Sequence, residues 1–388
     1  MDTLKLETFK ETIRKDPKLL DGIEAVMFDG CIAPASWTLP SHASLFTGMH
    51  QSEHNCHETK EVKSLDIERI RLAKDTIADD LHTAGYTTYG ISANPYISPV
   101  YGFEFDNYFE ESYFTDVFGS VIEISNALKP RVSKYRNEYG HDLAGMAKAV
   151  AREDPRLFLD LAISATMLTP VAAAKKARAK LIDGWPIEKG GRRIVERIRS
   201  MRFKKPFFMF VNLMEAHDPY IGKKGMDFNW ATPFMKEQPD EYIIEKWKRL
   251  YQKASHRSIR YGTDIVRDIM SRFGDNQIIV LTSDHGQAFN EHGFVGHGTV
   301  LFDEVIRVPM AVIVPKRFSK ETRDEHQSLA NIRAFVMAAV KGDTDAIRLL
   351  SGRAIAESFS IPANISNVKG IDRRKMKLLD RYQKRVFK

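Results

Sequence analysis

Short apolar runs alternate with longer amphipathic stretches along this chain. The runs at residues 23–28, 206–213, 278–282 and 309–315 are rich in Val, Ile, Phe and Leu, and each ends at turn-forming or polar residues. This is typical of strands that are buried on both faces, as in parallel sheets covered by helices. The pattern therefore predicts an α/β fold, in which a mostly parallel sheet is sandwiched by helices.

Between these runs, apolar residues recur at helical spacing. We expect helices at about 6–20, 65–84, 241–273 and 326–341. Residues 114–200 are rich in Ala, Lys, Arg and Leu and predict a long helical insertion. We assign residues 1–315 to a catalytic domain that contains this insertion, and residues 316–388 to a helical C-terminal segment that ends in a basic tail.

Chemically active side chains fall at strand ends or at a helix start. Thr38 lies two residues before Pro40, His217 lies shortly after the apolar run 206–213, and Asp284 and His285 follow the run 278–282. Open α/β sheets bind ligands at the carboxyl ends of their strands, and Pro is tolerated in the first turn of a helix. Thr38 is therefore expected at a helix N-terminus, where it is either a simple cap or part of an oxyanion site.

The segment TLPSHASLFTG, residues 38–48, resembles the nucleophile segment of the sulfatase family, within the alkaline phosphatase superfamily. In that family the segment reads CxPxR followed by ASLLTG, and its Cys is oxidised to formylglycine. Thr38 stands at the Cys position, Pro40 matches the motif Pro, and His42 replaces the Arg. No formylglycine forms from Thr. Related phosphodiesterases and lipoteichoic acid synthases use a Thr there, so the resemblance implies that Thr38 is the nucleophile.

The resemblance also implies a metal site. MDTLK at the start of the chain is similar to the first metal motif of the superfamily, and TSDHG is similar to the second. The implied ligands of one divalent ion are Asp2, Thr38, Asp284 and His285, a set that suits Mn²⁺, Mg²⁺ or Ca²⁺. Family members carry an apolar strand before the first Asp, whereas only Met1 precedes it here, so we expect that a short strand is missing from this start.

The resemblance implies four further residues that contact the substrate, namely His217, His297, Asn94 and His42. His217, with Pro219 two residues later, resembles the HxP motif, and His297 stands where sulfatases place a Lys. An imidazole can protonate a leaving alkoxide near neutral pH, so we expect His297 to be the general acid. Asn94 and His42 are expected to bind substrate oxygens, although Asn94 before a Pro is equally typical of a turn. For His292 we prefer a loop-ordering role, and Glu215 is at most an outer group.

The composition bears on the size of the core, the charge of the partners and the cellular compartment. The 388 residues include 43% hydrophobic residues, enough for a substantial core, and carry a formal charge of +7. That charge weakly favours an anionic substrate or an acidic surface; a solvated basic face is at least as good an interpretation. The two cysteines, Cys31 and Cys56, are expected to be small buried thiols, which fits a reducing, cytoplasmic compartment.

Membrane attachment is a minority interpretation. No uncharged apolar run reaches the roughly 18 residues that span a bilayer, and no cleavable signal peptide opens the chain. The nearest candidate is residues 161–174, followed by the basic run at 175–180. A buried helix is the main interpretation of this run, and a helix on a membrane surface is the alternative.

These residues lead to one functional hypothesis with two alternatives. We expect a hydrolase that cleaves a sulfate or phosphate ester of a sugar, lipid or small molecule through a metal-bound Thr nucleophile, with phosphoryl chemistry exceeding sulfuryl chemistry. The alternatives are a phosphotransferase acting on a surface glycan or lipid polymer and a noncatalytic binding module. No nucleic-acid partner is expected, and the oligomeric state is not predicted.

Overall fold

The computed structural model describes residues 1–112, 143–161, 187–222, 225–226, 235, 240–322, 325–362, 371–374, 377 and 384–388. The chain divides into two compact units, one formed by residues 1–111 and 190–388 and the other by residues 112–189. In the second unit the described residues form helix α7 (Leu143–Glu153) and a helical stretch at 155–161. The predicted apolar helix at 161–174 lies outside the described residues except for its first position.

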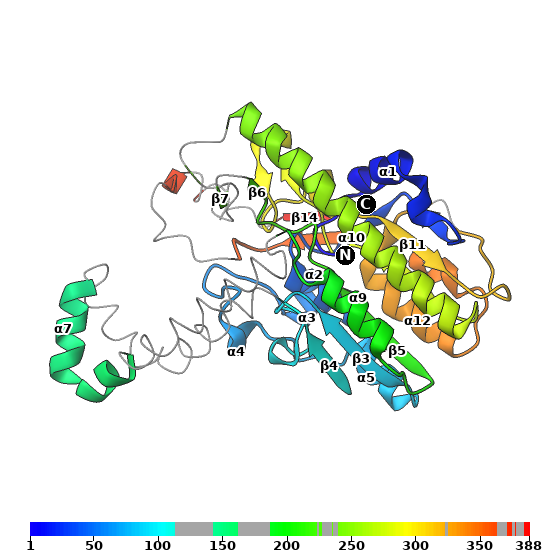
Figure 1. Ribbon diagram of the computed structural model, residues 1–388, viewed down its shortest axis with the longest axis horizontal. Helices are drawn as coiled ribbons and strands as arrows, with labels where there is room; N and C mark the ends of the chain where they lie inside the picture. The colour runs from blue at the N-terminus through cyan, green and yellow to red at the C-terminus, as the bar shows by residue number, and fades with distance from the viewer. Residues whose placement is uncertain are drawn as a thin grey trace. The chain divides into compact units, whose positions relative to one another are not determined.

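The first unit contains a three-stranded parallel sheet. Strand β3 (Thr87–Ser92) lies between β4 (Asn107–Glu110) and β5 (Phe207–Asn212), and all three run in the same direction (Figure 1). Ser92 pairs with Asn212 and with Glu110, so the carboxyl ends of the strands meet at one edge. The structure thus confirms the predicted strand at 206–213 and its parallel pairing.

A second three-stranded sheet has the order β1 (Val26–Phe28), β11 (Met310–Ile313) and β8 (Ile279–Thr282). Here β11 lies between its two neighbours and is antiparallel to both. The apolar runs at 23–28, 278–282 and 309–315 are therefore strands, as predicted, but they pair antiparallel with one another rather than parallel.

The first two residues of the chain lie between the two sheets. The backbone N–H of Asp2 donates to the carbonyl of Leu213, just beyond β5, at 2.8 Å. The amino group of Met1 donates to the carbonyl of Thr282, the last residue of β8, also at 2.8 Å. These hydrogen bonds join the edge of the parallel sheet to the edge of the antiparallel one, and they bring Asp2 to the strand ends.

Helices cover both faces of the parallel sheet. Successive side chains of a strand point to opposite faces, and in β5 both sets are apolar, so each face packs against helices. On β5, Phe208 and Phe210 pack into a core with helix α2 (Thr38–Thr47), whereas Met209 and Val211 pack with α9 (Gly191–Ser200) and α10 (Glu241–Phe273). Helix α10 has 33 residues and contacts both α9 and α1 (Leu6–Lys15) (Figure 1). The predicted helix at 241–273 is confirmed over its full length.

The remaining elements are short. The helices are α3 (Gln51–His54), α4 (Ile67–Ile70), α5 (Ile77–Thr83), α11 (Asp303–Ile306), α12 (Ile332–Val340), and the 3₁₀ turns η1 (Pro17–Leu20), η2 (Pro99–Tyr101), η5 (Glu291–Gly293), η6 (Leu329–Asn331) and η7 (Ala346–Leu350). The strand pairs are β2 (Cys31–Ile32) with β12 (Gln327–Ser328), β9 (Ala288–Phe289) with β10 (Val295–Gly296), β6 (Ile221–Gly222) with β7 (Gly225–Met226), and β13 (Ile355–Ser358) with β14 (Lys384–Phe387).

Two expectations about helices are wrong. The single helix predicted at 65–84 is two helices, α4 and α5, because Thr76 and Asp79 form a capping box that starts a new helix. The basic tail is not helical to its end, because residues 384–387 form β14, which pairs antiparallel with β13. Among the described residues, no helix has both the length and the apolar composition needed to cross a membrane.

Candidate active site and metal centre

Thr38 is the first residue of the buried helix α2. Pro40 lies in the first turn of α2, and Gly48, at a φ of 71°, ends the helix by donating from its N–H to the carbonyl of Ser44. Only 3% of Thr38 is exposed. The hydroxyl of Thr38 therefore lies at the positive end of a helix dipole, close to backbone N–H groups.

The structure brings the four predicted metal ligands together. Asp2, Asp284 and His285 are buried, and one potential ligand atom from each lies within 4.8 Å of those of the other two. The Thr38 Oγ1 atom lies 3.3 Å from His285 Nε2. Residues from the start of the chain, from α2 and from the loop after β8 thus form one cluster at the sheet edge.

The polar atoms of this cluster fit a cation. Asp284 Oδ1 accepts hydrogen bonds from the N–H groups of Thr3 (3.0 Å) and His285 (2.9 Å). Within the described part of the chain, no hydrogen-bond donor reaches Asp284 Oδ2, although this atom is buried. His285 Nδ1 donates to the carbonyl of Gly286 at 3.0 Å, which leaves the Nε2 lone pair facing the carboxylates. A buried carboxylate oxygen without a partner is costly, and a cation would satisfy it.

Asp2 is held in its ionised form. Its Oδ2 atom accepts from the Asn94 side chain at 2.8 Å, and its Oδ1 atom accepts from the Thr3 hydroxyl at 2.8 Å. Burial alone raises the pKa of Asp2, but the positive charge of His217 and the Asn94 hydrogen bond outweigh burial and hold this pKa well below its usual value. The anionic carboxylate is therefore available as a ligand.

Asn94 and His42 both contact the nucleophile segment. The Asn94 amide reaches Asp2, and it also lies 3.4 Å from Thr38 Oγ1. His42 Nδ1 donates to the Thr38 carbonyl at 2.9 Å and lies 3.6 Å from Asp284 Oδ2. Burial lowers the pKa of His42 more than Asp284 raises it, so the ring is neutral. The contacts of Asn94 and His42 with substrate stay predictions.

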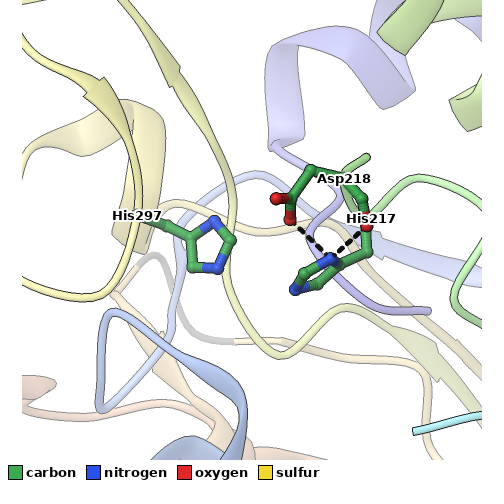
Figure 2. Close-up of side chains that lie close together, drawn as sticks. All are labelled: His217, Asp218 and His297. Carbon is green, nitrogen blue, oxygen red and sulfur yellow. Dashed lines mark hydrogen bonds and ion pairs between the residues drawn. The ribbon is translucent and has the colours of Figure 1, made fainter. Parts of the chain in front are cut away.

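The rings of His217 and His297 contact one another, with Asp218 against His217 (Figure 2). His217 Nδ1 lies 2.6 Å from Asp218 Oδ1 and 2.7 Å from the Asp218 carbonyl oxygen. The ring centre of His297 lies 5.1 Å from that of His217 and 4.6 Å from that of His285. One ligand atom from each of His217, Asp218 and His297 also lies within 4.8 Å of the other two, so this group could hold an ion as well.

The two imidazoles have opposite protonation states. Burial lowers the pKa of His217, but the negative charge of Asp218 outweighs burial and raises this pKa to about 9. His297 Nδ1 donates to the Gln287 side-chain oxygen at 2.7 Å. Burial and the neighbouring His285 and His217 lower the pKa of His297 well below its usual value. His217 is therefore a cation near neutral pH, while His297 is neutral with its Nε2 lone pair exposed to the site.

Three residues of the site were missed from the sequence, namely Thr3, Asp218 and Gln287. Asp218 directly follows His217, and Gln287 stands two residues after His285. Polar residues next to a metal-binding or catalytic His often orient its ring. That adjacency could have singled out both residues. Thr3 carried no such signal, because its importance depends on backbone conformation.

The secondary candidates have structural contacts. His292, in the loop after β9, has its Nε2 atom 3.5 Å from Oε2 of Glu304 in α11. The Glu215 side chain accepts a hydrogen bond from the N–H of Gly191 at 2.7 Å. Cys31 and Cys56 are buried free thiols, and burial raises the pKa of both. The buried thiols agree with the sequence-based expectation, and both sulfurs are poor nucleophiles.

The sheet between two layers of helices, with polar side chains gathered at its edge, defines an alkaline-phosphatase-like fold. A model of the Sulfatase family matches residues 5–342 of this chain. The protein belongs to the sulfatase family. The match confirms the predicted family and fold, and it supports the prediction of an enzyme that acts on esters. It does not test whether Thr38 is the nucleophile.

Solved structures agree on the fold. The phosphonate monoester hydrolase SpPMH from Silicibacter pomeroyi is 12% identical, with a TM-score of 0.53 over 94% of this chain and 79% of that one. The phosphonate monoester hydrolase of Agrobacterium radiobacter is 14% identical, with a TM-score of 0.50 over 95% and 80%. The C-terminal periplasmic domain of EcEptC from Escherichia coli is 12% identical, with a TM-score of 0.51 over 96% and 89%. No curated protein matches the chain.

The glycine of the DHG sequence generates the first prediction. A Cβ atom on Gly286 would lie 2.3 Å from the Glu304 carbonyl oxygen, too close for any side chain. The backbone cannot easily move away, because the Gly286 N–H donates to the Val305 carbonyl at 2.7 Å. Gly286→Ala should destabilise the protein by about 1–3 kcal/mol and displace Asp284 and His285. Chemical denaturation and metal titration measure both effects. Gly262→Ala is the control, because its nearest neighbour is a movable Leu281 methyl group at 3.1 Å; equal behaviour of the two variants would contradict the prediction.

Proposed function

We propose that this protein is a metal-dependent hydrolase of phosphate or sulfate esters, with Thr38 as its nucleophile and phosphoryl esters as its better substrates. The observation that carries the proposal is the position of the Thr38 hydroxyl, which lies at the N-terminus of α2 and 3.3 Å from His285 in the candidate metal cluster. A hydroxyl that served only as a helix cap would not need buried carboxylates beside it.

Asp2, Thr38, Asp284 and His285 would hold one divalent ion, of the Mn²⁺, Mg²⁺ or Ca²⁺ type. Such an ion supplies positive charge that lowers the pKa of the Thr38 hydroxyl and offsets charge on the substrate. The chain itself fixes the direction of attack. Asn94 donates to both Asp2 and Thr38, and His42 holds the Thr38 carbonyl, so the hydroxyl is oriented before substrate arrives.

His217 and His297 divide the work at the substrate. The cationic His217 binds a non-bridging oxygen of the ester and stabilises the charge that develops there. His297 is neutral in the free protein, and the approach of an anionic ester raises its pKa, so its Nε2 takes up a proton from solvent. Thr38 gives its hydroxyl proton to water, and its Oγ1 forms a bond to phosphorus while the bond to the leaving oxygen breaks; that oxygen takes the Nε2 proton of His297. A water molecule then attacks phosphorus, the bond from phosphorus to Oγ1 breaks, phosphate leaves, and Thr38 regains a proton.

Phosphoryl chemistry is favoured by the nucleophile, because Thr38 cannot become formylglycine. The fold is shared with phosphonate monoester hydrolases, which supports an anionic phosphorus ester as substrate. An acceptor alcohol in place of water would make the same site a phosphotransferase. Product analysis with and without added alcohols separates the two outcomes, and absence of turnover for every ester would leave only a binding module.

Removing the nucleophile tests the proposal directly. Thr38→Ala should lower kcat/KM for nitrophenyl phosphate and its diesters by about a thousandfold or more, while Thr38→Ser retains a measurable fraction. Removal of divalent ions with a chelator should abolish turnover of the native protein, and added Mn²⁺ should restore it. Undiminished activity of Thr38→Ala, or faster cleavage of nitrophenyl sulfate than of the phosphates by the native protein, would overturn the proposal.

The leaving-group role of His297 makes a third prediction. His297→Gln should lower kcat by about a hundredfold or more for alkyl esters, whose leaving oxygen needs a proton. For nitrophenyl esters, whose leaving group needs none, the loss should be small. Steady-state kinetics with a series of leaving groups measures the difference. Equal losses across the series would show that His297 is not the acid.

The ion pair of His217 predicts a pH effect. Since the pKa of His217 is raised to about 9, the cation is present below that pH and is lost as the pH rises through it. Asp218→Asn removes the negative partner and lowers this pKa, so the alkaline limb of the kcat/KM profile should move to lower pH. His82→Asn, at a surface ion pair with Asp106, is the control that should leave the profile unchanged. An unmoved alkaline limb in Asp218→Asn would contradict the assignment.

A further inference from the structure

Glu58 is a fully buried carboxylate that the proposed mechanism does not use. Its Oε2 atom accepts from the indole N–H of Trp37 at 2.7 Å. Its Oε1 atom accepts from the backbone N–H groups of Phe359 at 3.3 Å and Ser360 at 3.2 Å. Burial raises the pKa of Glu58 to about 7, although these N–H donors stabilise the anion. The side chain is therefore ionised at pH 8, and it joins two parts of the chain.

The first of these parts is the backbone beside the proposed nucleophile. Trp37 is the N-cap residue of α2, so it directly precedes Thr38, and its side chain is buried. The carbonyl of the preceding residue, Ser36, accepts from the N–H of Gly298 at 2.7 Å, and Gly298 directly follows His297. Residues 36 and 37 thus connect the backbone of the proposed nucleophile to that of the proposed acid.

The second part is a segment that contacts the same His297 loop. The hydroxyl of Ser358, the last residue of β13, donates to the carbonyl of Thr299 at 2.7 Å. Thr299 lies two residues after His297, and the two residues whose N–H groups bind Glu58 directly follow Ser358. One carboxylate therefore holds two segments that both bind the His297 loop, and the first of these segments leads into Thr38.

This connection needs an acceptor on both sides. Each oxygen of the Glu58 carboxylate faces N–H donors only, so both oxygens must accept. An amide has one oxygen and one NH₂ group, and whichever way it turns, its NH₂ group faces an N–H donor. A buried N–H without an acceptor is costly, so the chain on that side moves away. A displacement of about 1 Å can slow a reaction between positioned groups by about a hundredfold.

We propose that Glu58 is a positioning residue: by holding Trp37 and residues 359–360 together, its carboxylate fixes the Thr38 hydroxyl relative to His297. The inference rests on the proposed function in that Thr38 is the nucleophile and His297 the acid. The connection itself can be measured without turnover.

The first test measures hydrogen exchange by NMR at pH 8, without substrate. In Glu58→Gln one side loses its acceptor, so either the Trp37 indole N–H or the amides of residues 359 and 360 should exchange about tenfold faster or more. The ring resonances of His297, assigned with His297→Gln, should shift. The indole N–H of Trp247, buried in a different core cluster, reports general opening of the fold and should not exchange faster.

The second test is kinetic. Glu58→Gln should lower kcat for alkyl esters by about ten- to a hundredfold and change KM less than about threefold, because only the alignment of Thr38 and His297 is lost. Combined with His297→Gln, the two losses should be less than multiplicative, because both act on the same proton transfer. Glu357→Gln is the matched control and should keep kcat within about twofold. That buried carboxylate precedes the same segment but accepts from the N–H and hydroxyl of Ser52, each at 3.0 Å.

A merely structural role gives a different pattern. If Glu58 only supports the fold, the Trp247 indole N–H exchanges faster together with the others, the His297 resonances stay in place and kcat per folded molecule is unchanged. That result would overturn the inference. If Glu58→Gln does not fold, Trp37→Phe decides, because it removes one N–H donor and leaves Glu58 bound to residues 359 and 360. It should shift the His297 resonances and lower kcat by about tenfold, and unchanged resonances and kcat would again overturn the inference.

Failure of the inference and failure of the proposed function can be told apart. If the native protein turns over no ester, the proposed hydrolase is rejected, while faster exchange and shifted His297 resonances in Glu58→Gln still support the connection. If the native protein cleaves esters but Glu58→Gln leaves exchange, His297 and kcat unchanged, the positioning role alone is rejected.

Discussion

The candidate active site depends on two backbone hydrogen bonds made by the first two residues. Asp2 donates to Leu213 and Met1 donates to Thr282, so the start of the chain lies between the parallel and the antiparallel sheet. This contact places a carboxylate from residue 2 beside Asp284 and His285, more than 280 positions later in the sequence. Because the carboxyl ends of β3 and β5 lie at the same edge, the loop with Asn94 meets them there.

Burial of so many ionisable groups is tolerated because each has a specific partner. The carboxylates of Asp2 and Asp284 accept N–H or O–H donors and face imidazole rings. Asp218 keeps His217 charged, whereas burial keeps His42 neutral. One oxygen, Asp284 Oδ2, accepts no hydrogen bond within the described residues, and this is the position at which a cation is most needed. The electrostatics of the site thus agree with the metal chemistry of the sulfatase family.

Much of this could be predicted from local sequence. Apolar runs located the strands, helical spacing located α10, and motif order assigned the residues that the structure brings together, including Thr38 and Asp284. The rest depends on contacts that no local pattern encodes. The break between α4 and α5 follows from one capping box, and β14 forms only because β13 lies beside it. Thr3 has a φ of 61°, which strains a β-branched residue, and Asp284 and Tyr251, both more than 240 residues away, hold it there.

The opposite protonation states of His217 and His297 have a stereochemical consequence. The proposed phosphorus ester would meet a cation at His217 and a neutral imidazole at His297, so its non-bridging oxygens would not be equivalent. The candidate site is therefore asymmetric in charge. A phosphorothioate diester, whose sulfur makes the phosphorus a stereocentre, would be bound through its oxygen at His217, and the two enantiomeric arrangements at phosphorus would be distinguished.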